Sequence, residues 1–337
     1  QERCIALASV LLFVQFILLF SNHSIRNSEK VDYWEASTIM KGLFNGLDPG
    51  GIIISYHAWF GFNYLQQIEG RRPDVTVLSL PSFLVPKLFT EFETSRFQEI
   101  VIPKTLTKDF GSAFLTQNVS DHPIYWEPVV EYNGLVARYL VPDGLVFKIN
   151  PVPYELDDEA VQSYLSTLSS YLRFDQISDD SEELSFYAQL LSGHGTFFLE
   201  RGVYEIALGH FKMASTMVPH QTQFLNMLGI TYAYMEDYTQ AEKNFLEAIS
   251  IKPENYEPYL NLARMLMVNK QLDKAEHYFK KVLILFPKHL HALFSLGTIN
   301  SEWGNKEKAL GYFNKILELD ESNEKVKEEI DKLLRKM

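Results

Sequence analysis

The sequence predicts two folded parts, an α/β sheet domain followed by an all-α solenoid of helical hairpins, with one membrane-spanning helix ahead of them. Three observations support this: a 34-residue repeat in the second half, apolar runs alternating with helical patterns in the first half, and an uncharged amino-terminal segment. The 337 residues are enough for two hydrophobic cores. A hydrophobic content of 46% indicates globular rather than disordered chain.

The repeat consists of four residue types that recur every 34 positions. Fifteen of sixteen aligned positions agree, and the exception is Glu321 in the fourth proline position. The aligned sets are Gly195, Gly229, Ala263 and Gly297; Ala207, Ala241, Ala275 and Ala309; Phe211, Phe245, Phe279 and Phe313; and Pro219, Pro253 and Pro287. Such agreement indicates tandem copies of one structural unit.

Each recurring residue has a physical role in a helical hairpin. Small residues let two antiparallel helices approach closely, the phenylalanine is expected to fill the gap against the neighbouring hairpin, and proline ends the second helix. The pattern Leu-Gly-x-x-Tyr … Ala-x-x-x-Phe … Pro at residues 228–253 resembles the tetratricopeptide repeat. This resemblance implies four hairpins over roughly residues 187–321 and a charged cap helix over 322–337, together one domain from 187 to 337.

Stacked hairpins expose the first helix of each pair on one side. By repeat position, five residues are expected there as peptide-binding candidates: Asn226, Tyr234, Arg264, Met267 and Phe294. A surface that mixes amide, cationic and apolar groups suits an extended peptide or a partner helix. The alternative for each residue is packing between hairpins.

Residues 31–153 alternate between the two kinds of pattern. Apolar runs at residues 52–54, 75–80, 99–102 and 124–126 predict strands, and helical spacing is found at 34–44, 58–68, 83–92 and 106–115. Segments 136–141 and 145–149 flank a Pro-Asp-Gly turn at 142–144, which predicts a hairpin. The expected fold is a three-layer, Rossmann-like α/β domain with a hairpin at the sheet edge.

Ligands of such sheets bind at the carboxyl ends of the strands. The first such loop contains Ser55, Tyr56, His57 and Trp59, which are therefore the candidate residues of this domain. The loop lacks the glycines of a dinucleotide cradle, and no Walker sequence occurs, so no nucleotide cofactor is expected. Its aromatic rings suit a sugar or a lipid surface, or else the core.

No other pattern in the sequence indicates a catalytic, cofactor-binding or metal-binding residue. His289 and His291 are half of a metal site at most, and residues 71–74 read as a loop that pairs its own charges. The formal net charge of −12 argues against nucleic acid as a partner. Nine of the acidic residues lie between Glu155 and Glu183, so residues 154–186 are expected to be an acidic helical connector.

Residues 4–20 carry no charge and contain only two polar side chains. This length is at the lower end for a membrane span and longer than most signal-peptide cores. We expect residues 1–30 to be a transmembrane segment with its linker, either the end of a longer polytopic protein or a signal anchor, rather than a cleaved signal.

Several stretches resemble one known family: residues 46–55 (GLDPGGIIIS), 62–80 (FNYLQQIEGRRPDVTVLSL), 123–126 (PIYW) and 134–147 (GLVARYLVPDGLVF). They are similar to the soluble tail of polytopic membrane proteins with a glycosyltransferase-C-like region, whose vertebrate relative is a protein O-mannosyltransferase of the endoplasmic reticulum. The resemblance covers roughly residues 1–150. The family's catalytic acid belongs to membrane loops upstream of Gln1, so the resemblance supplies no active-site residue.

The expected function is that of a non-catalytic, extracytoplasmic (periplasmic or lumenal) region of a membrane glycosyltransferase. The repeats would bind a polypeptide acceptor or partner, and a glycan or lipid-linked sugar would be handled by the full-length protein. The alternative is a membrane-anchored repeat adaptor for protein–protein interaction with no enzymatic link. A third reading is a small-molecule enzyme built on the α/β domain, which would require a deep polar cleft at the strand ends.

Overall fold

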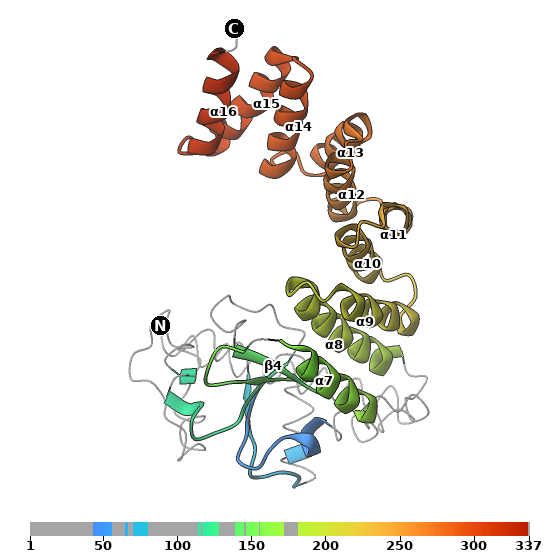
Figure 1. Ribbon diagram of the computed structural model, residues 1–337, viewed down its shortest axis with the longest axis vertical. Coiled ribbons are helices and arrows are strands. Elements are labelled where there is room, and N and C mark those ends of the chain that lie inside the picture. The colour runs from blue at the N-terminus through green and yellow to red at the C-terminus, as the bar shows by residue number, and fades with distance from the viewer. Residues whose placement is uncertain are drawn as a thin grey trace, which may run out of the picture. The chain divides into compact units, whose positions relative to one another are not determined.

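The computed structural model describes residues 43–55, 65–66, 70–79, 114–115, 117–127, 139–144, 146–154, 156–171 and 181–335. Its contacts divide the chain into two compact units, Gln1–Asp179 and Asp180–Met337. Each unit is described by itself. Among the residues that the structure describes, the first unit shows a β-sheet and the long helix α7, and the second unit consists of helices (Figure 1).

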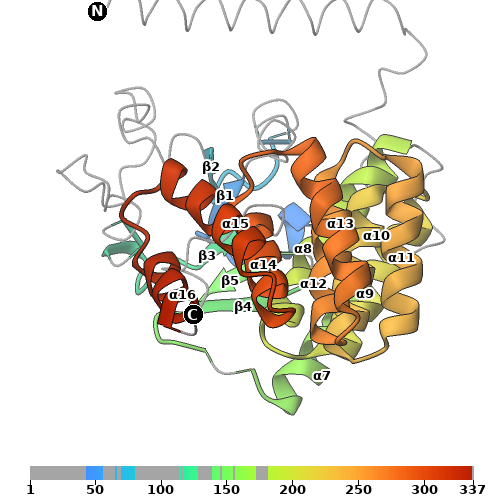
Figure 2. The same ribbon diagram turned by 90° about the horizontal axis from the view of Figure 1, so that it is seen from above.

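The first unit is built on a mixed five-stranded sheet with the order β2-β1-β3-β5-β4 (Figure 2). The strands are β1 (Ile52–Ser55), β2 (Thr76–Ser79), β3 (Ile124–Trp126), β4 (Leu140–Asp143) and β5 (Val146–Ile149). Strand β1 pairs in parallel with β2 and β3, whereas β5 is antiparallel to both β3 and β4. The predicted mixture of parallel strands and an edge hairpin is therefore present.

The inner strands are apolar on both faces. All residues of β1 and β3 are buried, as are Phe147 and Ile149 of β5. A strand flanked on both sides and covered on both faces has no solvent-facing position, which explains the unbroken apolar runs in the sequence. Helix α7 (Asp158–Tyr171) follows the sheet and begins with the exposed acids Asp158 and Glu159.

The predicted hairpin turn at residues 142–144 is shifted in the structure. Pro142 and Asp143 belong to β4 and pair with Phe147 and Val146, so the chain reverses only at Gly144, where φ is +60°. Strand β4 lies at the sheet edge, where a proline does not disrupt the hydrogen bonds of a second neighbour. The predicted hairpin is confirmed, but the predicted position of its turn is wrong.

Several predicted elements lie outside the described residues. These are the strand at 99–102, the helix at 83–92, most of the helices at 34–44, 58–68 and 106–115, and the membrane segment at 4–20. The helical layers of the predicted three-layer domain and its membrane helix therefore stay predictions. None of the helices that are described is long and apolar enough to cross a membrane.

The second unit contains four helical hairpins followed by a single helix, and the hairpins follow one another in chain order (Figure 1). Its helices are α8 (Ser181–Glu200), α9 (Tyr204–Met217), α10 (Thr222–Tyr234), α11 (Tyr238–Ile251), α12 (Tyr256–Val268), α13 (Leu272–Leu285), α14 (Leu290–Glu302), α15 (Lys306–Leu319) and α16 (Glu324–Arg335). Each first helix packs on its second helix, and each second helix contacts the next hairpin.

The recurring glycine and phenylalanine meet inside one hairpin. A Cβ atom built on Gly229 would lie 2.6 Å from the ring of Phe245, and one built on Gly195 would lie 2.7 Å from the ring of Phe211. The expectation that the phenylalanine mainly fills the gap to the neighbouring hairpin is therefore corrected. The ring lies against the glycine of its own hairpin, which is why the two residues recur together.

The turn between the two helices of every hairpin contains one residue in the left-handed region. These residues are Gly202, Glu236, Lys270 and Gly304, with φ between +58° and +76°, and they recur every 34 positions. An L-residue with a side chain is strained there, whereas glycine is not. The first and fourth hairpins therefore have an unstrained glycine at this turn position, whereas the second and third have a strained residue with a side chain.

We predict that Lys270→Gly raises the free energy of unfolding by about 0.5–1 kcal/mol, because it removes the Cβ clash at φ +58°. Urea denaturation followed by circular dichroism measures this change. The matched control is Lys281→Gly, an exposed position inside α13, which should lower stability by about 1 kcal/mol. Equal destabilisation by both substitutions would contradict the turn geometry.

Candidate functional site

The first helices of the second, third and fourth hairpins together define a surface, in which α10 contacts α12 directly and α14 follows α12 through α13. We call this surface the first-helix face. Its members are Asn226 and Tyr234 on α10, Asn261, Arg264 and Met267 on α12, and His291 and Phe294 on α14.

An amide pair joins α10 to α12 on the first-helix face. The Asn261 Nδ2 donates a hydrogen bond of 3.1 Å to Oδ1 of Asn226. Asn226 is buried, whereas Asn261 is partly exposed. The bond fixes the orientation of the Asn261 amide and leaves its Oδ1 and second N–H without a partner among the side chains and backbone that the structure describes. Such groups match those of a peptide backbone.

Tyr234 is exposed, with 58% of its surface accessible. Its ring stacks on that of Tyr204 at the start of α9, with 5.6 Å between centroids and an interplanar angle of 11°. The pair forms a flat aromatic surface whose orientation is set by both hairpins. An exposed, oriented ring presents contact area at little cost in side-chain entropy.

Met267 and Phe294 are half-buried and serve packing as well. Met267 packs against the hydrophobic core formed by α11 to α14. The ring of Phe294 lies 5.7 Å from that of Phe313 and contacts the core shared by α14, α15 and α16. The alternative role of packing between hairpins therefore applies to these two residues, which can offer only part of their surface to a ligand.

Arg264 is exposed, and its charge acts on the imidazole of His291. Burial first, and then the charges of Arg264, His289 and Lys325, hold the pKa of His291 below its usual value. The ammonium of Lys325 on α16 lies 4.6 Å from the centroid of the Phe294 ring. From the sequence, His291 was considered only as half of a metal site and residues 322–337 only as a cap, so neither His291 nor Lys325 was predicted at or beside this face.

The carboxyl edge of the sheet brings together one predicted residue and one that was not predicted. Ser55 ends β1 and donates a hydrogen bond of 2.6 Å to Oε2 of Glu127, the residue directly after β3. Both side chains are buried. Tyr56, His57 and Trp59 lie outside the described residues. An acidic residue directly after a buried strand was the signal for Glu127 in the sequence.

The opposite edge of the sheet is held by a polar network around residues 48–51. The guanidinium of Arg72 donates to the backbone oxygens of Phe44, Leu47 and Asp48 at 2.8–3.1 Å and pairs with Asp74 at 2.9 Å. The hydrogen bond from Arg72 lowers the pKa of Asp74 to about 2. These contacts agree with the reading of residues 71–74 as a loop that binds its own charges.

Asp48 is tied to the sheet by two further residues. Its carboxylate accepts a hydrogen bond of 2.6 Å from Lys148, which lowers the pKa of Asp48, and its backbone N–H lies 3.1 Å from the hydroxyl of Tyr125. Burial of this hydroxyl raises the pKa of Tyr125. The network joins the turn before β1 to β3 and β5, so its role is structural.

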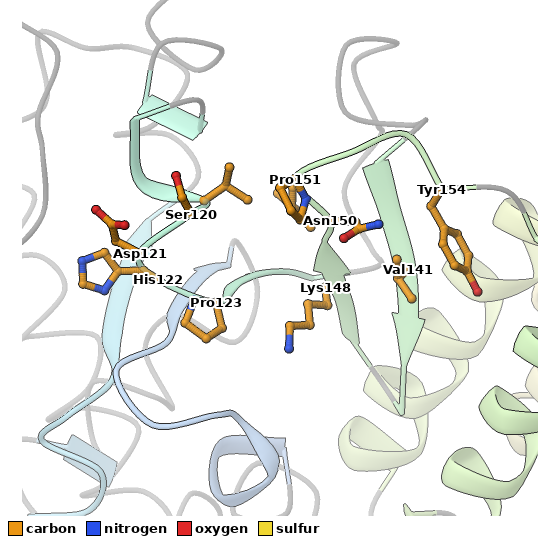
Figure 3. Close-up of a pocket in the computed structure, with 11 residues that line it drawn as sticks. Ser120, Asp121, His122, Pro123, Val141, Lys148, Asn150, Pro151 and Tyr154 are labelled. Atoms are coloured by element: carbon orange, nitrogen blue, oxygen red, sulfur yellow. The ribbon is translucent and has the colours of Figure 1, made fainter.

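A cavity of about 610 Å³ lies beside this network, between the segment that precedes β3 and the end of β5 (Figure 3). Its lining includes Ser120, Asp121, His122, Lys148, Asn150 and Tyr154. The Lys148 ammonium is already bound by Asp48. His122 donates through Nδ1 to the backbone oxygen of Gly50. The cavity lies at the amino edge of the parallel strands, opposite the edge at which such sheets bind ligands.

Within the parts of the chain that the structure describes, no three histidine, cysteine or acidic side chains are grouped as metal ligands. The predicted half-site divides into two other roles. Nδ1 of His289 accepts a hydrogen bond from the backbone N–H of Ala292 and so caps α14. His291 lies 3.3 Å from the hydroxyl of Ser295.

Comparison with known families bears on the helical unit. Two models of the tetratricopeptide repeat match, one over residues 222–255 and one over residues 256–322. Residues 222–322 are tetratricopeptide repeats. The hairpin geometry is the same for α8 and α9, which precede the matched range.

Curated proteins match over part of the chain. The UDP-N-acetylglucosamine–peptide N-acetylglucosaminyltransferase of Giardia intestinalis is 29% identical over 99 residues, 29% of this chain and 7% of that protein. The bovine BBSome complex member BBS4 is 23% identical over 37% of this chain and 24% of its own length. The human protein O-mannosyl-transferase TMTC2 is 26% identical over 39% of this chain and 16% of its own length. The chain thus spans less than a quarter of these relatives.

Solved structures resemble the repeats at a low level. The crystal structure of MamA has a TM-score of 0.41 and 18% identity, covering 51% of this chain and 99% of MamA. YrrB, described as a tetratricopeptide-repeat protein with an unusual peptide-binding site, has a TM-score of 0.36 and 21% identity, covering 50% of this chain and 88% of YrrB.

Proposed function

We propose that the tetratricopeptide-repeat unit binds an extended segment of another protein along the first-helix face. The observation that carries the proposal is the amide pair of Asn226 and Asn261, which spans two successive hairpins. A buried asparagine that orients an exposed one presents a fixed donor and acceptor to a peptide backbone. Tyr234 at one end and Arg264 further along add an aromatic and a charged contact.

The finer proposal is that this chain is a non-catalytic, extracytoplasmic part of a membrane glycosyltransferase, and that the repeats position its polypeptide acceptor. The similarity to human TMTC2 and the resemblance of residues 46–55, 62–80, 123–126 and 134–147 support it. Membrane attachment would come through residues 4–20, which lie outside the described residues. Transfer of a lipid-linked sugar would belong to other parts of the full-length protein.

The second candidate function is that of a repeat adaptor with no enzymatic link. BBS4, named as a member of the BBSome complex, and the human cell division cycle protein 16 homolog match at 23% and 27% identity over similar lengths of this chain. Neither name mentions a transferase activity. The reading frame upstream of Gln1 separates the two proposals, because the transferase requires further hydrophobic spans with an acidic residue in an outer loop.

Peptide binding is tested by probing an array of random twelve-residue peptides with the full chain in non-ionic detergent. Asn261→Ala should weaken binding of the captured peptides about five- to tenfold, because it removes backbone hydrogen bonds of about 1 kcal/mol each. The matched control is Asn244→Ala on α11, a second helix, where the amide only bonds to the backbone oxygen of Gln240. Equal effects of the two variants, or no captured peptide, would reject the first-helix face as the binding surface.

A further inference from the structure

The loop between α13 and α14 (Figure 1) exposes four large apolar side chains. Ile284 and Leu285 end α13, Phe286 follows them, and Leu290 begins α14. Ile284 is 71% exposed, and the other three are 39–44% exposed. We call these four residues the apolar turn. A single exposed apolar side chain is common in folded proteins, whereas a group of them on one turn marks a contact surface.

The fold of the hairpins does not require two of these side chains. The residues 34 positions before and after Ile284 and Phe286 are polar or charged: Ser250 and Lys252 in the second hairpin, and Glu318 and Asp320 in the fourth. Helices α11, α13 and α15 end at the same repeat position, so the turn forms with either kind of residue. Leu285 differs, since its counterparts Ile251 and Leu319 are apolar as well. The apolar character of Ile284 and Phe286 therefore serves a contact outside the hairpin.

Two lysines flank the apolar turn. Lys281 lies one helical turn before Ile284 on the same stripe of α13, and Lys288 lies in the loop itself. Both are exposed, and no carboxylate of the described residues lies within 4.0 Å of either ammonium. Residues 277–301 contain no aspartate or glutamate, although the chain as a whole has a formal net charge of −12. The turn thus combines apolar side chains with unpaired positive charge.

The surface is confined to this one turn. The loop before α12 carries Glu254 and Glu257, and the loop before α16 carries Asp320 and Glu321. These acids lie at or near the repeat positions that hold Phe286 and Lys288 in the third turn. A partner that is attracted to cationic and apolar groups would therefore contact the third turn and avoid the other two.

The ring of Phe286 is oriented by its neighbours without being buried. Its centroid lies 5.5 Å from that of Tyr256, the first residue of α12, and 5.6 Å from that of His289. The rings of Tyr256 and His289 are themselves 5.3 Å apart. Phe286 is nevertheless 44% exposed. A side chain that is already held in place loses little conformational entropy when it contacts a partner.

The composition of the apolar turn favours a lipid surface over a protein partner. Protein interfaces are enriched in tyrosine, tryptophan and arginine and depleted in lysine, and leucine is uncommon among their strongest contacts. Leucine, isoleucine and phenylalanine flanked by lysine are instead typical of segments that lie at a membrane interface. There the apolar side chains enter the boundary of the acyl chains, while the long lysine stems let the ammonium groups reach anionic headgroups.

We propose that the apolar turn docks the tetratricopeptide-repeat unit on a lipid surface that contains anionic phospholipids. Ile284 and Phe286 enter the interface, and Lys281 and Lys288 contact headgroup phosphates. This inference goes beyond the proposed function and is independent of it, because the residues of the apolar turn are not members of the first-helix face.

The test must report on the turn itself, because residues 4–20 of the full chain are expected to bind vesicles on their own. In the full chain with Cys4→Ala, the dye nitrobenzoxadiazole is attached through Ile284→Cys, and the matched control carries it through Ser250→Cys, at the same repeat position. The vesicles contain phosphatidylcholine, with or without phosphatidylserine, and a lipid with a nitroxide on its acyl chain. We expect the nitroxide to quench about half or more of the fluorescence at position 284 in vesicles with phosphatidylserine, and little of it at position 250.

Further variants of the chain labelled at position 284 separate the two kinds of contact. Phe286→Lys introduces the residue that the second hairpin has at this position and should abolish the quenching. Because this lysine adds positive charge, such a loss assigns the contact to the apolar ring. Lys281→Gln and Lys288→Gln should each lower the ratio of docked to free turn about fivefold in vesicles with phosphatidylserine. Lys315→Gln, at the position of Lys281 in the next hairpin, is the control and should change little.

Several results would overturn the proposal. Equal quenching at positions 284 and 250, or none at 284, rejects the docking surface, and equal quenching with and without phosphatidylserine rejects the role of anionic lipid. If the dye at position 284 brightens with protein concentration in the absence of vesicles, the occupant is a second copy of this chain and not lipid. Circular dichroism of each labelled variant verifies that its helices are intact. None of these results bears on peptide binding at the first-helix face.

Discussion

Phe245→Ala is expected to lower the free energy of unfolding of the repeat unit by about 3–5 kcal/mol. The ring is 1% exposed and fills the space left by the missing side chain of Gly229 on the facing helix. Its loss leaves a cavity at the centre of the second hairpin, and two helices already in contact cannot close further to fill it. Urea denaturation followed by circular dichroism measures the change.

The control for Phe245→Ala is its neighbour. Leu246 is 40% exposed on the same helix, so Leu246→Ala should cost no more than about 1 kcal/mol. A double-mutant cycle tests the pairing directly. Gly229→Ala should destabilise by about 1–3 kcal/mol through overpacking, and this cost should shrink when Phe245 is replaced by leucine. Additive effects would show that the glycine and the ring do not interact.

Arg72→Ala is the second large effect, and we expect it to destabilise the sheet by about 2–3 kcal/mol. The guanidinium donates to four backbone oxygens between Phe44 and Asp48 and to the carboxylate of Asp74, with only 18% of the side chain exposed. Hydrogen bonds from a charged donor contribute about 1.5–3 kcal/mol each, with losses that overlap. The backbone of Arg72 also has a strained φ of +44°, which these bonds outweigh.

Hydrogen–deuterium exchange of peptides covering residues 43–55 reports this effect in the full chain. The amides of β1 should exchange about tenfold or more faster in Arg72→Ala. Arg72→Lys keeps the charge beside Asp74 and lacks the planar fork that reaches several oxygens at once, so it should recover only a small part of the protection. Full recovery by lysine would show that charge, and not the fork, stabilises the turn.

The helical unit could be predicted almost completely from the sequence because its stabilising contacts recur. A contact like that of Gly229 and Phe245, repeated at 34 residues, leaves a small residue and a phenylalanine in every copy, with Ala263 in place of glycine in the third, and the helix boundaries follow. The left-handed backbone at Glu236 and Lys270 could not be predicted, because glutamate and lysine rarely adopt it. Glycine at the same position of the other two hairpins does indicate such a conformation. The predicted turn position at Pro142 was wrong for a related reason. Pro-Asp-Gly is typical of a turn, and this composition hid the fact that Pro142 and Asp143 pair with β5 in an edge strand.

The candidate sites were predictable only in part, because they combine residues that are far apart in sequence. The five residues assigned to the first-helix face are found on α10, α12 and α14. The bond from Asn261 to Asn226, the contact of Lys325 with Phe294 and the Ser55–Glu127 pair depend on spatial neighbours 31 to 72 residues away. Periodicity within one helix contains no information about them.

Pairing of glycine and phenylalanine gives the first, second and fourth hairpins a contact of their own, and a shared core joins successive hairpins into one array. Loss of order in such an array begins at a free end and advances one module at a time. Helix α16 joins the array through Val326 and Leu333, which pack in the core shared with α14 and α15. The order of α16 therefore depends on the hairpin of α14 and α15, and it would be lost together with that hairpin.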